Sequence, residues 1–239
     1  MKKTTHYWIR KSHRYLGLFT GIQFLMWTIG GLYFSWTNLD DIHGDQFHKE
    51  HEMHHTIPNH LLANIQDSTL QIESIRLRFI DHQPHFWIND EQLIDAETGE
   101  TRGEITKEEA LGIAQMHLID DLKVKEVERI EKVGKHHEYR ERPLPAWVIS
   151  YEGSENVKAY VSATDGSFQR VRHQSWRNFD FLWMMHTMDY QGRDNFNNWL
   201  LRIFSVVGLI TIVLGFALFF YSSNTMRKWR KNSRQNISK

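Results

Sequence analysis

The sequence predicts an α+β protein with two transmembrane helices flanking a polar α+β segment. Two observations predict the helices: residues 15–36 and residues 199–221 are apolar runs, and each matches the roughly 20 residues that a helical span needs. A third predicts the middle, where short stretches with strand-like alternation accompany an amphipathic helical pattern. The mean hydropathy of -0.53 therefore averages two apolar helices with a polar segment.

The first apolar run, residues 15–36, carries no Asp, Glu, Lys, Arg or His. A cleaved signal peptide would have an apolar region of only about 7–15 residues that ends at a small-residue cleavage site. The stretch "GGLYFSWTN" at residues 30–38 offers no such site. We therefore expect residues 15–36 to be an uncleaved membrane anchor.

The second run, residues 199–221, has a single charge, Arg202, close enough to the start for its side chain to reach the lipid headgroups. Both outer flanks are basic and contain no acid, and short basic flanks stay in the cytoplasm. We therefore expect residues 1–14 and 222–239 to be cytoplasmic and residues 38–198 to lie across the membrane. The basic residues are Lys2, Lys3, Arg10, Lys11 and Arg14, then Arg227, Lys228, Arg230, Lys231, Arg234 and Lys239.

Composition excludes several kinds of function. Lys plus Arg equals Asp plus Glu at 29 each, and all the acids fall between the two apolar runs, so no basic domain is left to bind nucleic acid. The chain has no cysteine, which excludes disulfides, iron–sulfur clusters and covalently attached c-type haem. It also lacks a glycine-rich fingerprint for nucleotide phosphates.

The middle segment contains a weak internal repeat. The stretches "LIDAETGE" (93–100) and "YVSATDGS" (160–167) share the pattern x-A-x-(T/D)-G, with glycines at Gly99 and Gly166. Two α+β units in tandem are the economical interpretation, although any strand–turn–helix domain can produce such turns by chance.

Each unit has its own expected elements. In the second, Thr106 and Glu109 have capping-box spacing before an amphipathic helix, and strand-like stretches follow at about 124–133, 146–152 and 157–163. In the first, we expect a helix after Pro58 and strands in "IESIRLRF", "HFWIND" and "QLIDA". The apolar face of the second-unit helix is Ala110, Ile113, Ala114 and Leu118.

Several of these stretches resemble a known family. The helix "ITKEEALGIAQMHL", the strands after it and "AYVSATDGSF" look like a PepSY domain. The stretches "HRYLGLFTG" and "FDFLWMMHTMDYQG", which lead into the two spans, look like the PepSY-associated transmembrane family. The expected organisation is a cytoplasmic N-terminus (1–14), helix 1 (15–36), a His-rich connector (37–58), a tandem PepSY-like periplasmic domain (59–174), an interfacial aromatic segment (175–198), helix 2 (199–221) and a cytoplasmic tail (222–239).

This resemblance implies a location and a chemistry. Larger members of the family have four spans and are bacterial inner-membrane proteins of iron acquisition, including haem-containing reductases of ferric siderophores. This chain has only two apolar runs, so it supplies at most half of such a bundle. The resemblance implies a haem-b electron-transfer subunit that helps to reduce ferric chelates at the periplasmic face.

His13 is the first candidate haem ligand. On a helix that continues from the first span, His13, Gly17 and Gly21 are four residues apart and share a face, and the glycines leave room beside the imidazole for a porphyrin edge. Alternatively, His13 and Arg14 lie near lipid phosphates while Gly17 and Gly21 form a G-x-x-x-G helix contact.

His186 is the second candidate, about a dozen residues before the second span and therefore at the opposite membrane face. Burial among aromatics would set the redox potential of an iron bound there. Alternatively, His186 is one polar member of an interfacial aromatic belt. Its aromatic neighbours are Trp176, Phe179, Phe181, Trp183, Tyr190, Phe196 and Trp199, and the alternative soft ligands are Met184, Met185 and Met188.

The two histidines cannot bind one iron, because about 20 helical residues rise roughly 30 Å. A parallel homodimer would pair each histidine with its copy and hold two bis-histidine haem b groups in a four-helix bundle. Electrons would come from a cytoplasmic donor or the quinone pool, since the chain has no flavin or nicotinamide site. The small residues expected to give helix 2 a close-packing face are Ser205, Gly208, Thr211 and Gly215.

A run of histidines, "HGDQFHKEHEMHHTIPNH", occupies residues 43–60. Within it His51, Glu52 and His55 match the H-E-x-x-H zinc motif, but a stretch so rich in His produces that match easily and no third ligand is evident. His48, His51 and His55 share a helical face that suits weak binding of Zn, Cu, Ni or Fe. A solvated connector is the simpler interpretation.

The residues leave two classes of function open. One is haem-b electron transfer in iron acquisition. The other is a non-catalytic, membrane-anchored PepSY module that binds or regulates a partner in the cell envelope. Metal storage by residues 43–60 is a third, weaker option.

Overall fold

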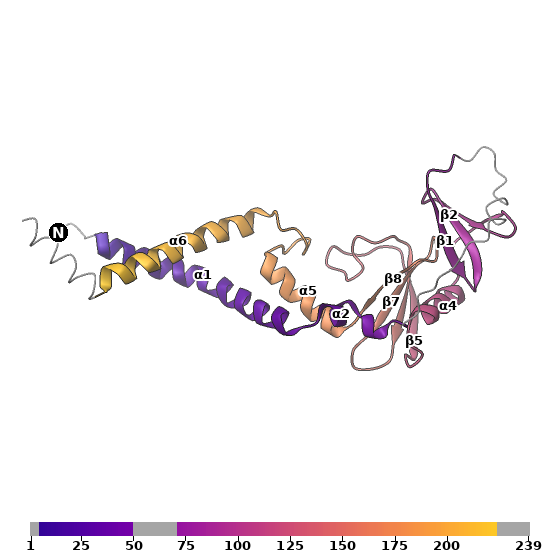
Figure 1. Cartoon of the computed structure of the whole chain (residues 1–239), viewed down its shortest axis with the longest axis horizontal. Helices are drawn as coiled ribbons and strands as arrows, with labels where there is room; N and C mark the ends of the chain where they lie inside the picture. The colour runs from indigo at the N-terminus through magenta and orange to yellow at the C-terminus, as the bar shows by residue number, and fades with distance from the viewer. Residues whose placement is uncertain (1–4, 50–70, 224–239) are drawn as a thin grey trace, which may run out of the picture. The chain divides into compact units, whose positions relative to one another are not determined.

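The computed structural model describes residues 5–49 and 71–223 (Figure 1). The chain divides into two compact units, which we call the helical unit (residues 1–36 and 180–239) and the sheet unit (residues 37–179). The α+β class is confirmed, because two helices long and apolar enough to cross a membrane accompany two antiparallel sheets. The helix expected after Pro58 lies outside the described residues.

The long helices of the helical unit are α1 (Thr5–Trp36) and α6 (Trp199–Ser222). α1 begins well before the apolar run, so His13 is a helical residue. Large apolar side chains cover the outer surfaces of both helices: Leu18 is 73% exposed and Leu209 is 62% exposed. Soluble monomers rarely expose so continuous an apolar surface, and the two helices are therefore compatible with a membrane protein.

Small residues on α6 let it approach α1 closely. A Cβ added at Gly208 would lie 2.9 Å from Cζ of Phe24, and one added at Gly215 would lie 3.2 Å from Cε1 of His13. The expected close-packing face on the second span is therefore present, but it packs against α1 of the same chain. Of the four small residues expected there, Gly208 and Thr211 are buried, Gly215 is half-buried and Ser205 is exposed.

A shorter helix, α5 (Gln174–Thr187), leads into a tight turn before α6. Its residues from Asp180 onwards belong to the helical unit, and the buried Asp180 carboxylate forms an ion pair with Arg193 in the turn. Asp189 accepts backbone N–H groups of the turn at 2.9–3.4 Å. Asn198 then caps α6 through its Oδ1, which satisfies one of the N–H groups that a helix start leaves without a partner.

The sheet unit holds two four-stranded antiparallel sheets, each a meander in which every strand pairs with the next along the chain. The three strand stretches expected in each unit are all present, and β4 and β8 add a fourth strand to each sheet. The first sheet contains β1 (Ile75–Ile80), β2 (Gln83–Ile88), β3 (Gln92–Asp95) and β4 (Thr101–Arg102). The second contains β5 (Val124–Ile130), β6 (Ala146–Tyr151), β7 (Lys158–Ser162) and β8 (Phe168–Arg172).

The two turns that share a sequence pattern also share their hydrogen bonds. Each glycine has a positive φ, 76° at Gly99 and 67° at Gly166, a conformation in which glycine avoids the strain that a Cβ would introduce. The third strand of each sheet thus ends in the same kind of turn. The matching bonds run from Gly99 N–H to Asp95 O (2.9 Å) and Gly166 N–H to Ser162 O (3.1 Å), and from Ala96 N–H to Pro84 O (3.0 Å) and Ala163 N–H to Pro145 O (2.9 Å).

Helix α4 (Lys107–His117) packs against the second sheet. Its predicted capping box is present: Thr106 Oγ1 accepts the N–H of Glu109 at 3.2 Å, and Glu109 Oε2 accepts the N–H of Thr106 at 2.7 Å. The predicted apolar face of this helix forms part of the main hydrophobic core. The exposed fractions of its residues are 0% for Ala110, 1% for Ile113, 0% for Ala114 and 2% for Leu118.

The described part of the His-rich connector is packed, in contrast to the solvated segment that we expected. It forms the short helix α2 (Leu39–His43) and the 3₁₀ turn η1 (Asp45–Phe47). Ile42 is 1% exposed and Phe47 is 8% exposed, and His48 forms a β-bridge with Leu118. The sequence did not predict this packing, because the segment is anchored by two widely spaced apolar residues, Ile42 and Phe47, that form no periodic pattern.

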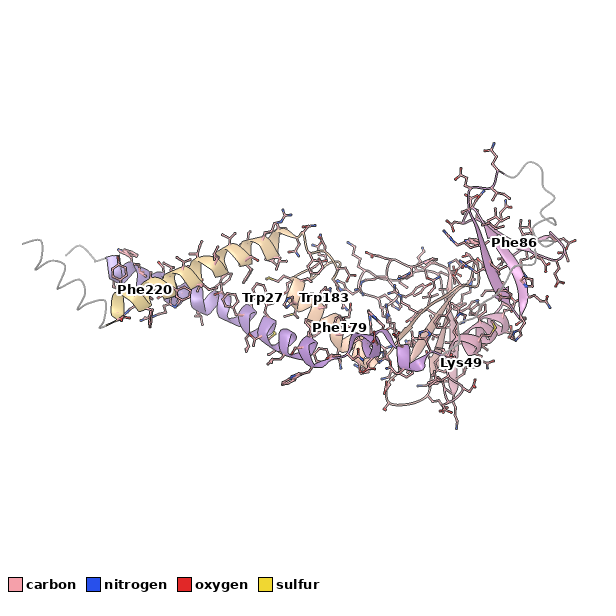
Figure 2. All side chains as sticks on the ribbon, in the orientation of Figure 1. Trp27, Lys49, Phe86, Phe179, Trp183 and Phe220 are labelled. Atoms are coloured by element: carbon pink, nitrogen blue, oxygen red, sulfur yellow. The ribbon has the colours of Figure 1, made fainter. Side chains whose placement is uncertain are left out.

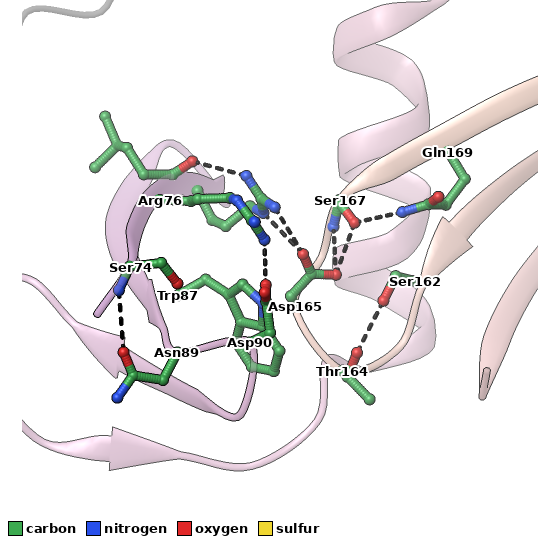
Figure 3. A network of polar contacts seen from close by, with 12 residues as sticks. Ser74, Arg76, Trp87, Asn89, Asp90, Ser162, Thr164, Asp165, Ser167 and Gln169 are labelled. Carbon is green, nitrogen blue, oxygen red and sulfur yellow. Dashed lines mark hydrogen bonds and ion pairs between the residues drawn. The ribbon is translucent and has the colours of Figure 1, made fainter. Parts of the chain in front are cut away.

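A polar network joins the two sheets (Figure 3). Arg78 of β1 donates from Nε to Asp165 Oδ2 at 2.9 Å, and Ser167 Oγ donates to Asp165 Oδ1 at 2.7 Å. Asp165 is 6% exposed. Burial alone would raise the pKa of Asp165, but hydrogen bonds from neighbouring hydroxyls and the charge of Arg78 outweigh it and hold the pKa below its usual value.

We expect Gly208→Leu to destabilise the helical unit by about 1–3 kcal/mol, because the new side chain must displace the Phe24 ring that lies 2.9 Å from the ideal Cβ. Thermal unfolding of the full-length protein in a neutral detergent measures this. The matched control is Gly17→Leu, since nothing lies within 4 Å of the ideal Cβ of Gly17. Equal destabilisation by the two variants would contradict the packing described here.

We expect Asp165→Asn to lower the stability of the sheet unit at neutral pH by about 2–3 kcal/mol, because it leaves Arg78 without its partner. The folded-state pKa of Asp165 is lowered, so its contribution is present above the unfolded pKa of about 4 and is lost as the pH falls through the lower folded pKa. The unfolding curves of the two proteins should therefore converge at acid pH. Asp90→Asn, at a more exposed ion pair with Arg76, is the control and should change little.

Candidate functional site

His186 lies near the end of α5, within an aromatic shell of the helical unit. Its ring centroid is 5.9 Å from that of Phe34, 6.1 Å from that of Trp27 and 6.4 Å from that of Trp183. Figure 2 shows Trp27 on α1 and Trp183 on α5. The aromatic environment expected around His186 thus comes from α1 as well as from its own segment.

The ring of His186 makes aromatic contacts but no hydrogen bond to any residue that the structure describes. Its Nδ1 atom is buried without a partner, which usually costs about 1–3 kcal/mol. Within residues 5–49 and 71–223, two other buried side-chain atoms lack a hydrogen-bonding partner, His173 Nδ1 and Arg193 Nε. Those two side chains are bonded elsewhere, since His173 Nε2 lies 3.2 Å from Ile42 O and Arg193 pairs with Asp180. His186 is therefore the least satisfied of the three.

Two hydrogen bonds fix the backbone that carries His186. Gln23 Nε2 donates to Met185 O at 2.8 Å, and Trp27 Nε1 donates to His186 O at 2.9 Å. Both donors lie on α1. These positioning residues were not predicted, although the sequence holds a signal: Gln23 is the one amide side chain in the first apolar run, and a polar group in a span normally bonds another helix.

His13 faces α6. Its Nδ1 lies 3.1 Å from the backbone oxygen of Thr211, and Gly215 leaves room for its ring. A carbonyl oxygen only accepts hydrogen bonds, so Nδ1 carries the proton and the lone pair of the neutral ring is on Nε2. Donation from one ring nitrogen to a carbonyl is how proteins commonly orient a histidine that binds metal through the other.

His13, Gly17 and Gly21 all lie on α1, four residues apart, as expected. The imidazole packs against α6, whereas nothing lies within 4 Å of an ideal Cβ at Gly17 or Gly21. Four residues advance an α-helix by slightly more than one turn, about 40°. Gly17 and Gly21 are therefore offset from His13 by about 40° and 80° around the helix axis.

His13 lies far along α1 from the part of that helix that surrounds His186. The residues of α1 that surround His186 are Trp27 and Phe34, which follow His13 by 14 and 21 residues. At 1.5 Å per residue, this corresponds to roughly 20–30 Å along the helix axis. The structure does not bring the two histidines together, in agreement with the expectation that one iron cannot be bound by both.

The histidine run adds no metal centre within residues 5–49 and 71–223, where no group of three or more His, Cys, Asp or Glu side chains could hold an ion. His51, Glu52 and His55 lie outside the described residues. His48 packs edge-on against Phe168 at 5.5 Å. Burial lowers the pKa of His48; nearby His117 lowers it further and Asp45 opposes both.

Comparison of the chain with protein-family models, curated proteins and solved structures yields no match. The PepSY resemblance therefore stays a prediction that rests on motifs in the sequence.

The two histidines should respond oppositely to replacement by phenylalanine in haem-free protein. We expect His186→Phe to leave the melting temperature unchanged or raise it, because it removes a buried polar atom that has no partner, worth about 1 kcal/mol or more. His13→Phe should lower it, because the bond to Thr211 O is lost and a larger ring meets Gly215, together about 1 kcal/mol. Equal losses in both variants would contradict the assignment of His186 as unsatisfied.

Proposed function

We propose that the protein is a membrane haem-b electron-transfer subunit that helps to reduce ferric chelates, with His13 and His186 as the iron ligands. The observation that carries this proposal is the buried Nδ1 of His186, which has no hydrogen-bonding partner in the part of the chain that the structure describes. Buried polar groups are nearly always satisfied, and an exception calls for an explanation. A ligand role for the imidazole supplies one.

The surroundings of His186 suit a ligand. The aromatic residues surround the ring, whose Nδ1 atom is buried, and the bonds from Gln23 and Trp27 hold the α5 backbone in place. A ring held in this way is preorganised, so binding would require little rearrangement of the helix. Haem b, when bound, supplies one-electron chemistry whose potential depends on the axial ligands and on burial.

The surroundings of His13 also suit a ligand, for a different reason. The hydrogen bond to Thr211 O keeps the proton on Nδ1, which leaves the Nε2 lone pair for a metal. Gly215 accepts the ring against α6 without a clash. The two helices thus orient this imidazole before any cofactor binds.

The proposed location is the bacterial inner membrane, with both termini in the cytoplasm and residues 38–198 in the periplasm. The support is the pair of long apolar helices together with their basic flanks. In this orientation His13 lies at the cytoplasmic side and His186 at the periplasmic side. An electron would enter near His13 from a cytoplasmic or quinone donor and leave near His186 towards a ferric chelate.

A parallel homodimer completes the proposal, because each chain supplies one histidine at each membrane face. Two chains would supply two pairs of histidines and so hold two haem b groups. Of the small residues of α6, Gly208, Thr211 and Gly215 already contact α1 of the same chain. The second copy would therefore approach α1 near Gly17 and Gly21, where there is nothing within 4 Å of an ideal Cβ.

The test is spectral. Full-length protein purified from haem-replete cells should show a Soret band and a sharp reduced α-band, with about one haem per chain. His13→Ala and His186→Ala should each remove about half of the haem, because the two histidines serve different irons. The control is His48→Ala, a histidine of the sheet unit, which should leave the haem content unchanged. Colourless protein from all preparations would sink the proposal.

A second candidate function is binding of an envelope partner by the sheet unit, without electron transfer. It is favoured by a cavity of about 520 Å³, a size within the usual range for ligand pockets. Haem-free protein that co-purifies with a specific envelope protein would support this second function against the first. The cavity is lined by residues that include Lys49, His82, Gln115, Asp120 and Tyr151.

A further inference from the structure

The cavity of about 520 Å³ in the sheet unit has an apolar wall. The side chains of this wall either belong to the main hydrophobic core or pack against it, and they come from the end of α4 and the chain that follows it. Small organic ligands usually occupy pockets of about 300–1,000 Å³, so the cavity is large enough for one. The apolar side chains are Met116, Leu118, Ile119 and Leu122.

The cavity also contains a tyrosine hydroxyl without a partner. Tyr151, the last residue of β6, lines the cavity and is 5% exposed. Its hydroxyl makes no hydrogen bond within residues 5–49 and 71–223, yet it is not one of the fully buried atoms that lack a partner there. The hydroxyl oxygen therefore reaches the open space of the cavity. Burial raises the pKa of Tyr151 to about 12, so the hydroxyl keeps its proton and can donate it.

The other two buried tyrosines of the described residues are satisfied. Tyr160 Oη donates to Glu138 Oε1 at 2.6 Å, and Tyr139 Oη donates to Pro143 O at 2.9 Å. Buried polar groups nearly always have such a partner. Tyr151 is the exception among the three, and an acceptor oxygen placed in the cavity would satisfy it.

The charges at the cavity favour an uncharged ligand. Lys49 Nζ lies 2.7 Å from Asp120 Oδ1 and also donates to Gln115 O at 2.9 Å, so the two opposite charges neutralise each other. The remaining ionisable side chain of the described lining, apart from Tyr151, is that of His82, which is exposed. An ion placed against the apolar wall would lose its hydration and gain no counter-charge there, which is costly.

We propose that this cavity binds a small uncharged molecule with an apolar body and a carbonyl oxygen, and that the carbonyl accepts a hydrogen bond from Tyr151. The apolar body packs against the wall formed by Met116, Ile119 and Leu122. The proposal deepens the second candidate function, because it rests on the same cavity and names the ligand class. It is independent of the haem proposal.

The test uses the full-length protein in phosphatidylcholine nanodiscs, which contain no free detergent to compete for the cavity. The probe is 4-fluorobenzamide, which has an apolar ring and one carbonyl oxygen, and its binding is followed by fluorine NMR. We expect saturable binding with a Kd of about 1–10 mM, as is usual for a ligand of about ten non-hydrogen atoms. Empty nanodiscs give the background from partition into lipid.

Tyr151→Phe should weaken binding of the probe roughly fivefold, because it removes the donor and keeps the ring. The variant should fold normally, since the hydroxyl has no partner to lose. The matched control is Tyr160→Phe, on the neighbouring strand β7, whose ring belongs to a separate hydrophobic cluster. It should lower the melting temperature, because the bond to Glu138 is lost, and should bind the probe as wild type.

The charged counterpart 4-fluorobenzoate tests the preference for an uncharged ligand and should bind roughly tenfold more weakly or not at all. Absence of saturable binding above empty nanodiscs, equal affinity for the benzoate, or wild-type affinity in Tyr151→Phe overturns the proposal. If Tyr151→Phe does not fold by circular dichroism, the comparison of benzamide with benzoate on the wild-type protein decides. Co-purification of an envelope protein is measured separately, so failure of the second candidate function is distinguishable from failure of this proposal.

Discussion

The helical unit depends on one constraint: a polar group in apolar surroundings has no water to bond and must find a partner within the protein. The polar side chains on the inner faces of α1 meet this constraint by bonding to backbone oxygens. Two of these bonds hold α5 and one holds α6, so the same requirement that satisfies the side chains also assembles the helices. The pairs are His13 with Thr211 O, Gln23 with Met185 O and Trp27 with His186 O.

Local patterns in the sequence predicted much of the fold. The two apolar runs, the capping box at Thr106 and the repeated turns at Gly99 and Gly166 each depend on residues close together in the chain, and the structure has all of them. Contacts between segments that are distant in the sequence could not be predicted from local patterns. Gln23 and Met185 are 162 residues apart, and no pattern at either end names the other. His13 and His186 were singled out by their positions beside the two apolar runs, whereas the residues that position them required the structure.

The two sheets also show how similar elements diverge. Arg102 ends the last strand of the first sheet, and its Nη2 lies 2.7 Å and 2.9 Å from the two carboxylate oxygens of Glu109. Arg172 ends the last strand of the second sheet and has no such partner among the described residues, although it is more deeply buried. The two corresponding arginines are therefore held differently. A carboxylate pairs with Arg102, whereas aromatic and backbone contacts hold Arg172. The composition of the chain could not predict which arginine has an acidic partner, because the total numbers of acids and bases are equal.

His186 and Arg172 are both buried groups with an incomplete set of partners, and α5 carries His186 and one contact of Arg172. Trp176, near its start, stacks on Arg172, and His186 lies near its end. The exceptions differ in kind: His186 has a buried ring nitrogen without a partner, whereas Arg172 is held by aromatic and backbone contacts. An imidazole nitrogen can donate or accept a hydrogen bond, whereas a guanidinium only donates. Because the two groups differ in chemistry and lie in different units of the chain, replacing one should leave the other intact.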